Sequence, residues 1–289
     1  MCRLYGFIAT EPTKVECSLI RAQNALLQQS RLDSRGFRHP DGWGIAYYVD
    51  ALPVVERRSG AAYEDPRFDA AAKLVHARIV IAHVRAASVG DPSTANSHPF
   101  HLGRWVFAHN GTIPKFEKVG PRLEASTEVA ELLRYRRGTT DSELAFLWIL
   151  GRIRRVARGG LEGDVLVEQM VLAVQDALSS IENWCRDEGA TEAPGLNFLL
   201  TDGGCLVASR RGNTAFWIVR EDAVRCEVCG VCHCSVCGSD RGRPHKPRPG
   251  YRAVVVASEP ITSESWAEIP EGHMLAVDDS VERVELVPI

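Results

Sequence analysis

Short apolar runs, rich in β-branched and aromatic residues, recur along the chain between polar and glycine-rich stretches. Runs of this length and composition predict β-strands. The predicted strands are 44–49, 78–84, 104–108, 197–200, 205–209, 215–219, 253–257 and 284–287. The chain is therefore expected to be rich in strands.

Longer segments place apolar residues at helical spacing, and they predict three helices at 18–29, 142–156 and 164–186. Within the second segment, apolar residues from Phe146 to Ile153 recur at i, i+3, i+4 and i+7, which predicts one buried helix face. Asp141 comes just before this segment and is a candidate N-cap.

Most predicted strands are neighbours in sequence and do not alternate with helices. This order favours an α+β stack of antiparallel sheets over a doubly wound parallel sheet. Gly/Pro-rich connections at 189–195 and 238–250 are the only plausible domain boundaries, and neither separates two independent cores. We therefore expect a single domain over residues 2–289, with an elaborated Cys-rich loop inserted at about 226–250.

The composition is that of a globular enzyme, with 45% apolar residues, 25% charged residues and a formal net charge of −3. The one basic stretch, 241–248, is short and broken by prolines, so a nucleic-acid partner is not expected. The apolar runs fall short of the roughly 20 residues that a membrane span requires. The N-terminus lacks the pattern of a signal peptide, so the predicted location is cytoplasmic, without membrane association.

Cys2 is the first candidate for chemistry because of its place in the chain. A small second residue permits removal of Met1, which would leave a free α-amine beside the thiol. An α-amine has a pKa of about 7.7–8.0, so part of it is neutral at pH 7 and can accept the thiol proton. One residue then supplies both nucleophile and base. Many proteins begin Met-Cys, so this signal is weak alone.

The sequence Asn110-Gly111 directly follows an apolar run and has two interpretations. A strand followed by Asn-Gly is typical of a hairpin turn. Alternatively, the Asn110 side-chain amide and the Gly111 backbone N–H form an oxyanion hole. Glycine at position 111 would allow a backbone geometry that presents its N–H outward.

Three further residues are candidates for substrate binding. Arg85 ends an apolar run and suits bidentate binding of a carboxylate, although a structural ion pair explains it equally well. Asp141 can cap a helix, bind a substrate ammonium, or do both. Trp43 belongs to the sequence Asp-Gly-Trp-Gly, which by itself predicts only a turn leading into a strand.

In combination, Cys2, Arg85, Asn110-Gly111 and Asp141 resemble the glutaminase domain of class II glutamine amidotransferases, which are N-terminal-nucleophile hydrolases. The resemblance is strongest to the stand-alone YafJ-like and ergothioneine-pathway amidohydrolase-like type. It covers most of residues 2–156 and continues through later segments. It implies a four-layer α/β/β/α sandwich of two mainly antiparallel sheets, and a small-molecule glutamine or γ-glutamyl substrate.

The resemblance also implies a role for each matching residue. Cys2 would be the nucleophile, and Asn110 and Gly111 would form the oxyanion hole. Arg85 would hold the substrate α-carboxylate with help from the Ser88 hydroxyl, and Asp141 would hold the α-ammonium. Trp43 would line the pocket. No cofactor is implied for catalysis.

Five cysteines between positions 226 and 237 need a separate explanation. Cys226, Cys229, Cys234 and Cys237 form two Cys-x-x-Cys pairs, which suit a structural zinc ion, although only four residues separate the pairs. An iron–sulfur cluster and the absence of any metal are the alternatives. The cluster lies between two family-like strands, so we expect it not to be catalytic.

The remaining isolated cysteines, Cys17, Cys185 and Cys205, are expected to be small buried hydrophobic residues.

Three functions are compatible with the sequence. The first is an amidohydrolase that acts alone on a γ-glutamyl compound. The second is a glutaminase subunit that supplies ammonia to a separate synthetase partner. The third is a catalytically silent scaffold that uses the cysteine loop for contacts, which the intact set of catalytic residues disfavours.

Overall fold

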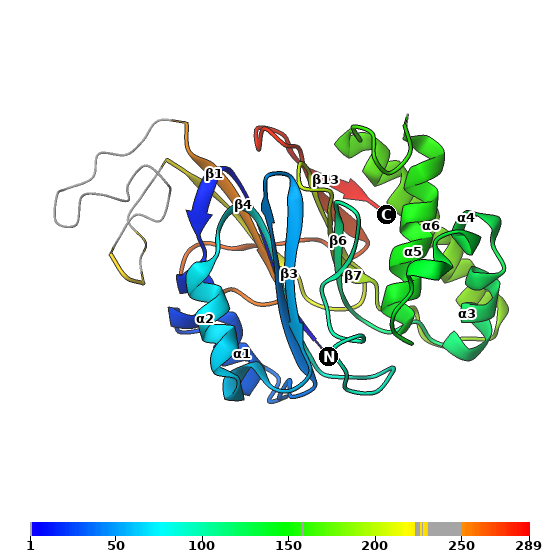
Figure 1. Cartoon of the computed structure of the whole chain (residues 1–289), viewed down its shortest axis with the longest axis horizontal. Coiled ribbons are helices and arrows are strands. Elements are labelled where there is room, and N and C mark those ends of the chain that lie inside the picture. The colour runs from blue at the N-terminus through cyan, green and yellow to red at the C-terminus, as the bar shows by residue number, and fades with distance from the viewer. Residues whose placement is uncertain (1, 158, 223–225, 227, 231–249) are drawn as a thin grey trace.

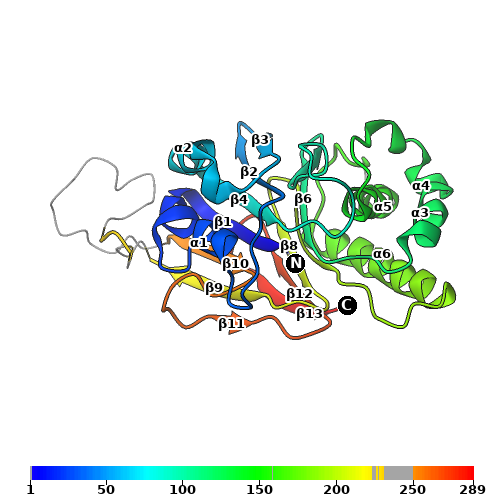
Figure 2. The same ribbon diagram turned by 90° about the horizontal axis from the view of Figure 1, so that it is seen from below.

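The computed structural model describes residues 2–157, 159–222, 226, 228–230 and 250–289. Two β-sheets face each other, and helices cover the outer face of each sheet (Figures 1 and 2). This is the four-layer α/β/β/α arrangement of two antiparallel sheets that the sequence resemblance implied. The prediction of the fold class is confirmed.

The first sheet has seven strands in the order β11-β9-β10-β1-β4-β2-β3, and neighbouring strands are antiparallel. Its strands are β1 (Arg3–Lys14), β2 (Gly42–Val49), β3 (Leu52–Arg58), β4 (His76–Arg85), β9 (Phe216–Glu221), β10 (Arg252–Ala257) and β11 (Ala267–Glu268). The N-terminal strand β1 lies between β10 and β4, near the middle of this sheet. The residue before it is therefore held by a central strand.

The second sheet has six strands in the order β13-β12-β8-β7-β6-β5, again antiparallel. Its strands are β5 (Phe100–Leu102), β6 (Trp105–Asn110), β7 (Asn197–Thr201), β8 (Leu206–Arg210), β12 (His273–Val277) and β13 (Val284–Pro288). Strand β6, which ends at Asn110, contacts both β1 and β4 of the first sheet.

The helices form the two outer layers. On the first sheet lie η1 (Cys17–Arg21), α1 (Leu26–Arg31), η2 (Ala62–Glu64) and α2 (Pro66–Leu74). On the second lie α3 (Phe116–Glu124), α4 (Thr127–Ala130), η3 (Leu133–Tyr135), α5 (Asp141–Val156) and α6 (Val167–Asp187). Among the described residues, no helix is both long and apolar enough to cross a membrane.

The predicted helix 18–29 is wrong as one continuous element. The chain turns between η1 and α1, where Ala22 and Ala25 have extended backbones. The Asn24 side chain donates a hydrogen bond of 2.7 Å to the carbonyl of Pro260. A tertiary contact thus keeps the backbone extended in a segment whose apolar spacing favours a helix.

Helix α5 begins where the sequence predicts but is capped differently. The N-cap is Thr140, whose hydroxyl accepts from the Glu143 amide, and Asp141 is the first helical residue. Nearly every residue from Asp141 to Gly151 is buried, not only one face. This helix contacts β6 of the second sheet and the helices α3, α4 and α6, so apolar residues on all its sides find partners.

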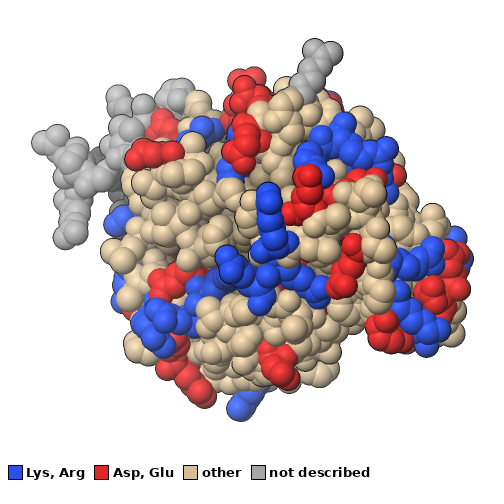
Figure 3. All heavy atoms as spheres, turned by 45° about the vertical axis from the view of Figure 1, so that its right-hand side comes forward, with Lys and Arg blue, Asp and Glu red and all other residues tan. Residues whose placement is uncertain are grey.

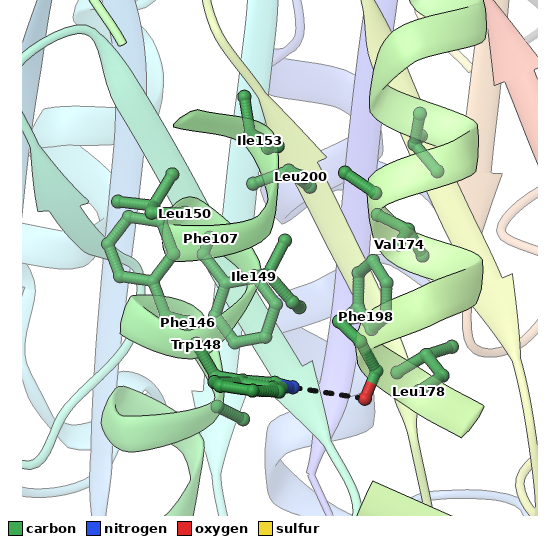
Figure 4. Packing of buried hydrophobic residues seen from close by; sticks show 14 of the residues in the cluster. Phe107, Phe146, Trp148, Ile149, Leu150, Ile153, Val174, Leu178, Phe198 and Leu200 are labelled. Carbon is green, nitrogen blue, oxygen red and sulfur yellow. Dashed lines mark hydrogen bonds between the residues drawn. The ribbon is translucent and has the colours of Figure 1, made fainter. Parts of the chain in front are cut away.

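Aromatic and aliphatic residues pack together in the core between the second sheet and its helices (Figure 4). Phe107 of β6 stacks on Phe146 of α5, with ring centroids 5.3 Å apart. The Trp148 indole donates a hydrogen bond of 3.2 Å to the Ala177 carbonyl of α6, which satisfies its only polar group. These contacts fix α5, and with it Asp141, against the sheet.

Charges lie on the outer surface of the helical layer. Arg122 of α3 pairs with Asp187 at the end of α6, and Arg154 of α5 pairs with Glu131. Over this layer, at the right of Figure 3, positive and negative side chains lie beside one another. Exposed pairs of this kind each contribute about 0–1 kcal/mol, so stability rests mainly on the buried clusters.

Strand alternation decides which residues face the space between the sheets. Leu4 and Ile8 of β1, Ile79 and Ile81 of β4, and Val106 and Ala108 of β6 share the cluster packed between the sheets. Side chains two residues apart on a strand point to the same face. Continuing these series places the side chains of Cys2, Arg85 and Asn110 toward the same inter-sheet space.

Candidate active site

Cys2, Arg85 and Asn110 lie at one end of the sandwich because of strand register. Arg3 pairs with Val84, so Cys2 lies beside the end of β4 where Arg85 is found. The Cys2 Sγ atom lies 3.5 Å from the carbonyl oxygen of Ala86. The end of β6 completes the group from the opposite sheet. Three strand ends therefore bring together a thiol, a guanidinium and an amide.

Cys2 is buried, with 8% of its surface exposed. Burial raises the pKa of its thiol, although the positive charges of Arg85 and Arg3 act in the opposite direction. A thiol in this setting is protonated at neutral pH and needs a base before it can act as a nucleophile. The site thus calls for a proton acceptor adjacent to Cys2.

Arg3 fixes the backbone of Cys2. Its guanidinium donates a hydrogen bond of 2.9 Å to the Cys2 carbonyl. It also forms buried ion pairs with Asp33 and Glu259, and Asp33 in turn accepts a hydrogen bond from the ring of His39. No motif in the sequence singled out this network, because its members come from three separate segments.

Arg85 organises the loop that follows β4. Its guanidinium donates to the carbonyls of Val89, Gly90 and Asp91, at 2.8 to 3.1 Å. These bonds account for three of its five N–H groups. Among the described residues, Arg85 therefore donates to backbone carbonyls and does not form the structural ion pair that was the alternative interpretation of its position. Burial lowers the pKa of Arg85, and the nearby Cys2 opposes that shift most strongly.

Asn110 and Gly111 are held by close packing of the backbone. Asn110 pairs with Asn197 of β7, and its carbonyl accepts a hydrogen bond from the Asn213 side chain. The Asn110 Oδ1 atom is buried without a partner among the described residues. A Cβ atom at position 111 would lie 1.9 Å from the Gly195 oxygen. Gly111 is therefore required by this close approach, and its φ angle is not positive.

His109 ties this turn to helix α5. Its Nε2–H donates to the Gly195 carbonyl and its Nδ1 accepts from the Ser142 hydroxyl, both at 2.8 Å. The carbonyl acceptor fixes the tautomer, and burial lowers the pKa of the ring, so it stays neutral. Sequence reasoning assigned no role to His109, although its position beside Asn110 is a usable signal.

Asp141 accepts hydrogen bonds from the amides of Ile113 and Ser142, each at 2.8 Å. It thereby holds the chain just after Gly111 next to the start of α5. The Ser88 hydroxyl bonds to the Thr112 hydroxyl at 2.8 Å, on the exposed side of the same region. The structure thus groups Asp141 and Ser88 around the segment that follows Asn110.

Trp43 does not lie in this group. It is fully buried under α2, where its ring packs edge-on against Phe68 and its N–H donates to Asp65. Strand alternation directs it away from the inter-sheet space, because Trp43 and Ile45 face the outer helices. The expected pocket-lining role does not fit this placement.

The predicted metal ligands are only partly described. Cys234 and Cys237 lie outside the described residues, and so does most of the predicted inserted loop at about 226–250. Cys226 and Cys229 are described, in the connection between β9 and β10. Cys185 and Cys205 are buried as expected, whereas Cys17 is buried next to Cys226 and Cys229.

Known proteins are similar to this chain over almost its whole length. The chain is 28% identical to the probable glutamine amidotransferase DUG3 of Saccharomyces cerevisiae, over 96% of this chain and 82% of that protein. It is 28% identical to the putative glutamine amidotransferase YafJ of Escherichia coli, over 94% and 96% respectively. It is 24% identical to the γ-glutamyl-hercynylcysteine sulfoxide hydrolase of Mycobacterium tuberculosis, over 96% and 93%.

Solved structures show the same fold. A glutamine aminotransferase class-II domain protein from Silicibacter pomeroyi superposes with a TM-score of 0.62 at 22% identity, and the match covers 99% of both chains. The sequence matches the family of class-II glutamine amidotransferases over residues 1–286. The chain therefore belongs to the class-II glutamine amidotransferases.

Proposed function

We propose that this enzyme is an amidohydrolase that acts on the side-chain amide of glutamine or of a γ-glutamyl compound. The observation that carries the proposal is the placement of Cys2, Arg85 and Asn110 on one inter-sheet face at the same end of the sandwich. A relative of matching length is named as a hydrolase of a γ-glutamyl compound. A chain that pairs a nucleophile with groups for a carboxylate and an oxyanion suits that chemistry.

The proposed reaction begins with removal of Met1, which frees the α-amine of Cys2. This amine takes the thiol proton, and the sulfur attacks the amide carbon of the substrate. The carbon–nitrogen bond breaks as the protonated α-amine gives its proton to the leaving amine. Water then cleaves the thioester, which releases glutamate and restores Cys2.

Asn110 and Gly111 are proposed to stabilise the oxyanion of both tetrahedral intermediates. The Asn110 amide faces the inter-sheet space, and its backbone is fixed by Asn197 and Asn213. Donors that are already in place do not have to reorganise when the charge forms. The contacts of His109 and Gly195 around Gly111 serve this purpose.

Substrate recognition is assigned to a pair of opposite charges. Arg85 would bind the α-carboxylate through its remaining N–H groups, and Asp141 would bind the α-ammonium. Ser88 would add a hydroxyl near the carboxylate. These residues would contact only the glutamyl part of the substrate, so the leaving amine can vary.

The test is a kinetic comparison of glutamine with a panel of γ-glutamyl dipeptides and γ-glutamyl amines, using mature protein alone. We expect at least one γ-glutamyl compound to be hydrolysed with a higher kcat/KM than glutamine. Turnover of glutamine that requires an added synthetase would contradict the proposal and support the ammonia-supplying subunit. No turnover of any substrate, with Cys2 intact and Met1 removed, would support the silent scaffold.

A further inference from the structure

A second group of thiols lies away from the candidate active site. The sulfur atoms of Cys17, Cys226 and Cys229 all lie within 4.8 Å of one another. Cys17 begins η1, after the far end of β1 from Cys2, whereas Cys226 and Cys229 belong to the connection between β9 and β10. In Figures 1 and 2 the described part of this connection, drawn in yellow, lies at the left, away from the end marked N.

The spacing of these sulfur atoms suits a bound metal ion. Zinc–thiolate bonds are about 2.3 Å long, which places two sulfur ligands of a tetrahedral site about 3.8 Å apart. The three sulfur atoms need to move by at most about 1 Å to reach that geometry. Cys226-x-x-Cys229 also has the short ligand spacing common in structural zinc sites.

A pocket lies beside the described part of this connection. It is lined by Val228 together with Ala22, Asn24, Ile261 and Thr262. Val228 itself is 36% exposed. A metal ion bound by Cys17, Cys226 and Cys229 would hold this segment against η1.

We propose that Cys17, Cys226 and Cys229 together bind one Zn²⁺ ion, which anchors the β9–β10 connection to η1. The three thiolates supply three of the four ligands of a tetrahedral site, and the fourth position is left to solvent or a further side chain. Binding releases the thiol protons and crosslinks two segments that are distant in sequence. The proposal is independent of the glutamyl chemistry, because no residue of this group belongs to the active site.

Cys17 distinguishes this site from one made only of cysteines in the inserted loop. The full chain, purified without added metal, should contain about one zinc per chain. Cys17→Ser should lose most of this zinc and lower the Tm, while hydrolysis of a small substrate by Cys2 continues. Cys205→Ser is the matched control, because Cys17 and Cys205 are similarly buried, at 5% and 7% exposure. The control should keep its zinc.

Replacement of zinc by Co²⁺ gives a direct view of the ligands. The wild-type protein should show sulfur-to-cobalt charge-transfer absorption, which is reduced in Cys17→Ser and unchanged in Cys205→Ser. An identical metal content and spectrum in Cys17→Ser would overturn the proposal.

A second measurement uses the wild-type chain alone, so it does not depend on the folding of a variant. Alkylation mapped by mass spectrometry should label Cys17, Cys226 and Cys229 faster after treatment with a chelator, with no change at Cys185. Rates that are independent of the chelator, or a disulfide between two of the three cysteines in place of metal, would also overturn it.

Discussion

Cys2 and the cluster of Cys17, Cys226 and Cys229 place thiols in opposite surroundings. Cys2 is a single thiol next to two arginines, on a strand end held by the buried pairs of Arg3. In the cluster, three sulfur atoms lie beside one another. Cys2 has the guanidinium groups proposed to act on a charged substrate as neighbours, whereas each thiol of the cluster has two other thiols beside it. On the two proposals made above, the neighbours of a cysteine decide whether it acts as a nucleophile or as a metal ligand.

Of the substitutions that test this comparison, Cys2→Ala is expected to have the largest effect on turnover. Loss of the nucleophile should reduce kcat by about 10,000-fold or more. Zinc content and Tm should stay close to the wild-type values, because Cys2 is separated from the cluster by the length of β1. Assays of turnover and of metal content on the same preparation check both statements. Substantial residual turnover, insensitive to a thiol reagent, would assign catalysis elsewhere.

Asn110→Ala should have the next largest effect. An oxyanion donor acts on a charge that exists only in the transition state, so kcat should fall by about 100- to 1,000-fold with little change in KM. Asn183→Ala, at an exposed position on α6, is the control and should behave like wild type. A kcat for Asn110→Ala within a few-fold of wild type would refute the oxyanion assignment.

Arg85→Lys tests recognition of the carboxylate. A lysine keeps the charge but loses the planar fork, so KM should rise by about 10- to 100-fold. A substrate analogue without the α-carboxylate provides the control, because its poor kcat/KM should hardly change in the variant. If the variant impairs both substrates equally, Arg85 acts only through the loop carbonyls that it binds.

His39 is expected to affect stability and not turnover at neutral pH. Burial, together with Arg3, lowers its pKa to about 4, below the value of about 6.5 in an unfolded chain. Between these values the unfolded state binds a proton that the folded state excludes, so stability falls as the pH drops from about 6.5 to about 4. The loss is roughly 3 kcal/mol. The free energy of unfolding of His39→Gln, measured by chemical denaturation, should decline less steeply with falling pH over this range. An unchanged slope would show that His39 does not cause the decline.

Elements with a strong local pattern could be predicted from the sequence. The strands that end at Arg85 and Asn110 each contain a continuous apolar run, and both strands are buried along that run. Strand β1 was not predicted, although it positions Cys2. Its pairing with β4 and β10 decides its structure, and those partners lie far along the chain.

Features that depend on distant contacts could not be predicted. Asn24 interrupts the first helix by bonding to Pro260, which is 236 residues away. Gly111 is required by the approach of Gly195, and Cys17 gains its significance only beside Cys226. In each case the contact partner lies far along the chain, so no local pattern reports the contact.

The most direct test of the central claim is labelling with an electrophilic glutamine analogue, followed by intact-mass and peptide mass spectrometry. The account predicts loss of Met1 and one covalent adduct per chain, located at Cys2, with hydrolysis lost in proportion to labelling. Cys17, Cys226 and Cys229 should remain unlabelled. A fully active protein that retains Met1, or inactivation by an adduct at another cysteine, would contradict the account.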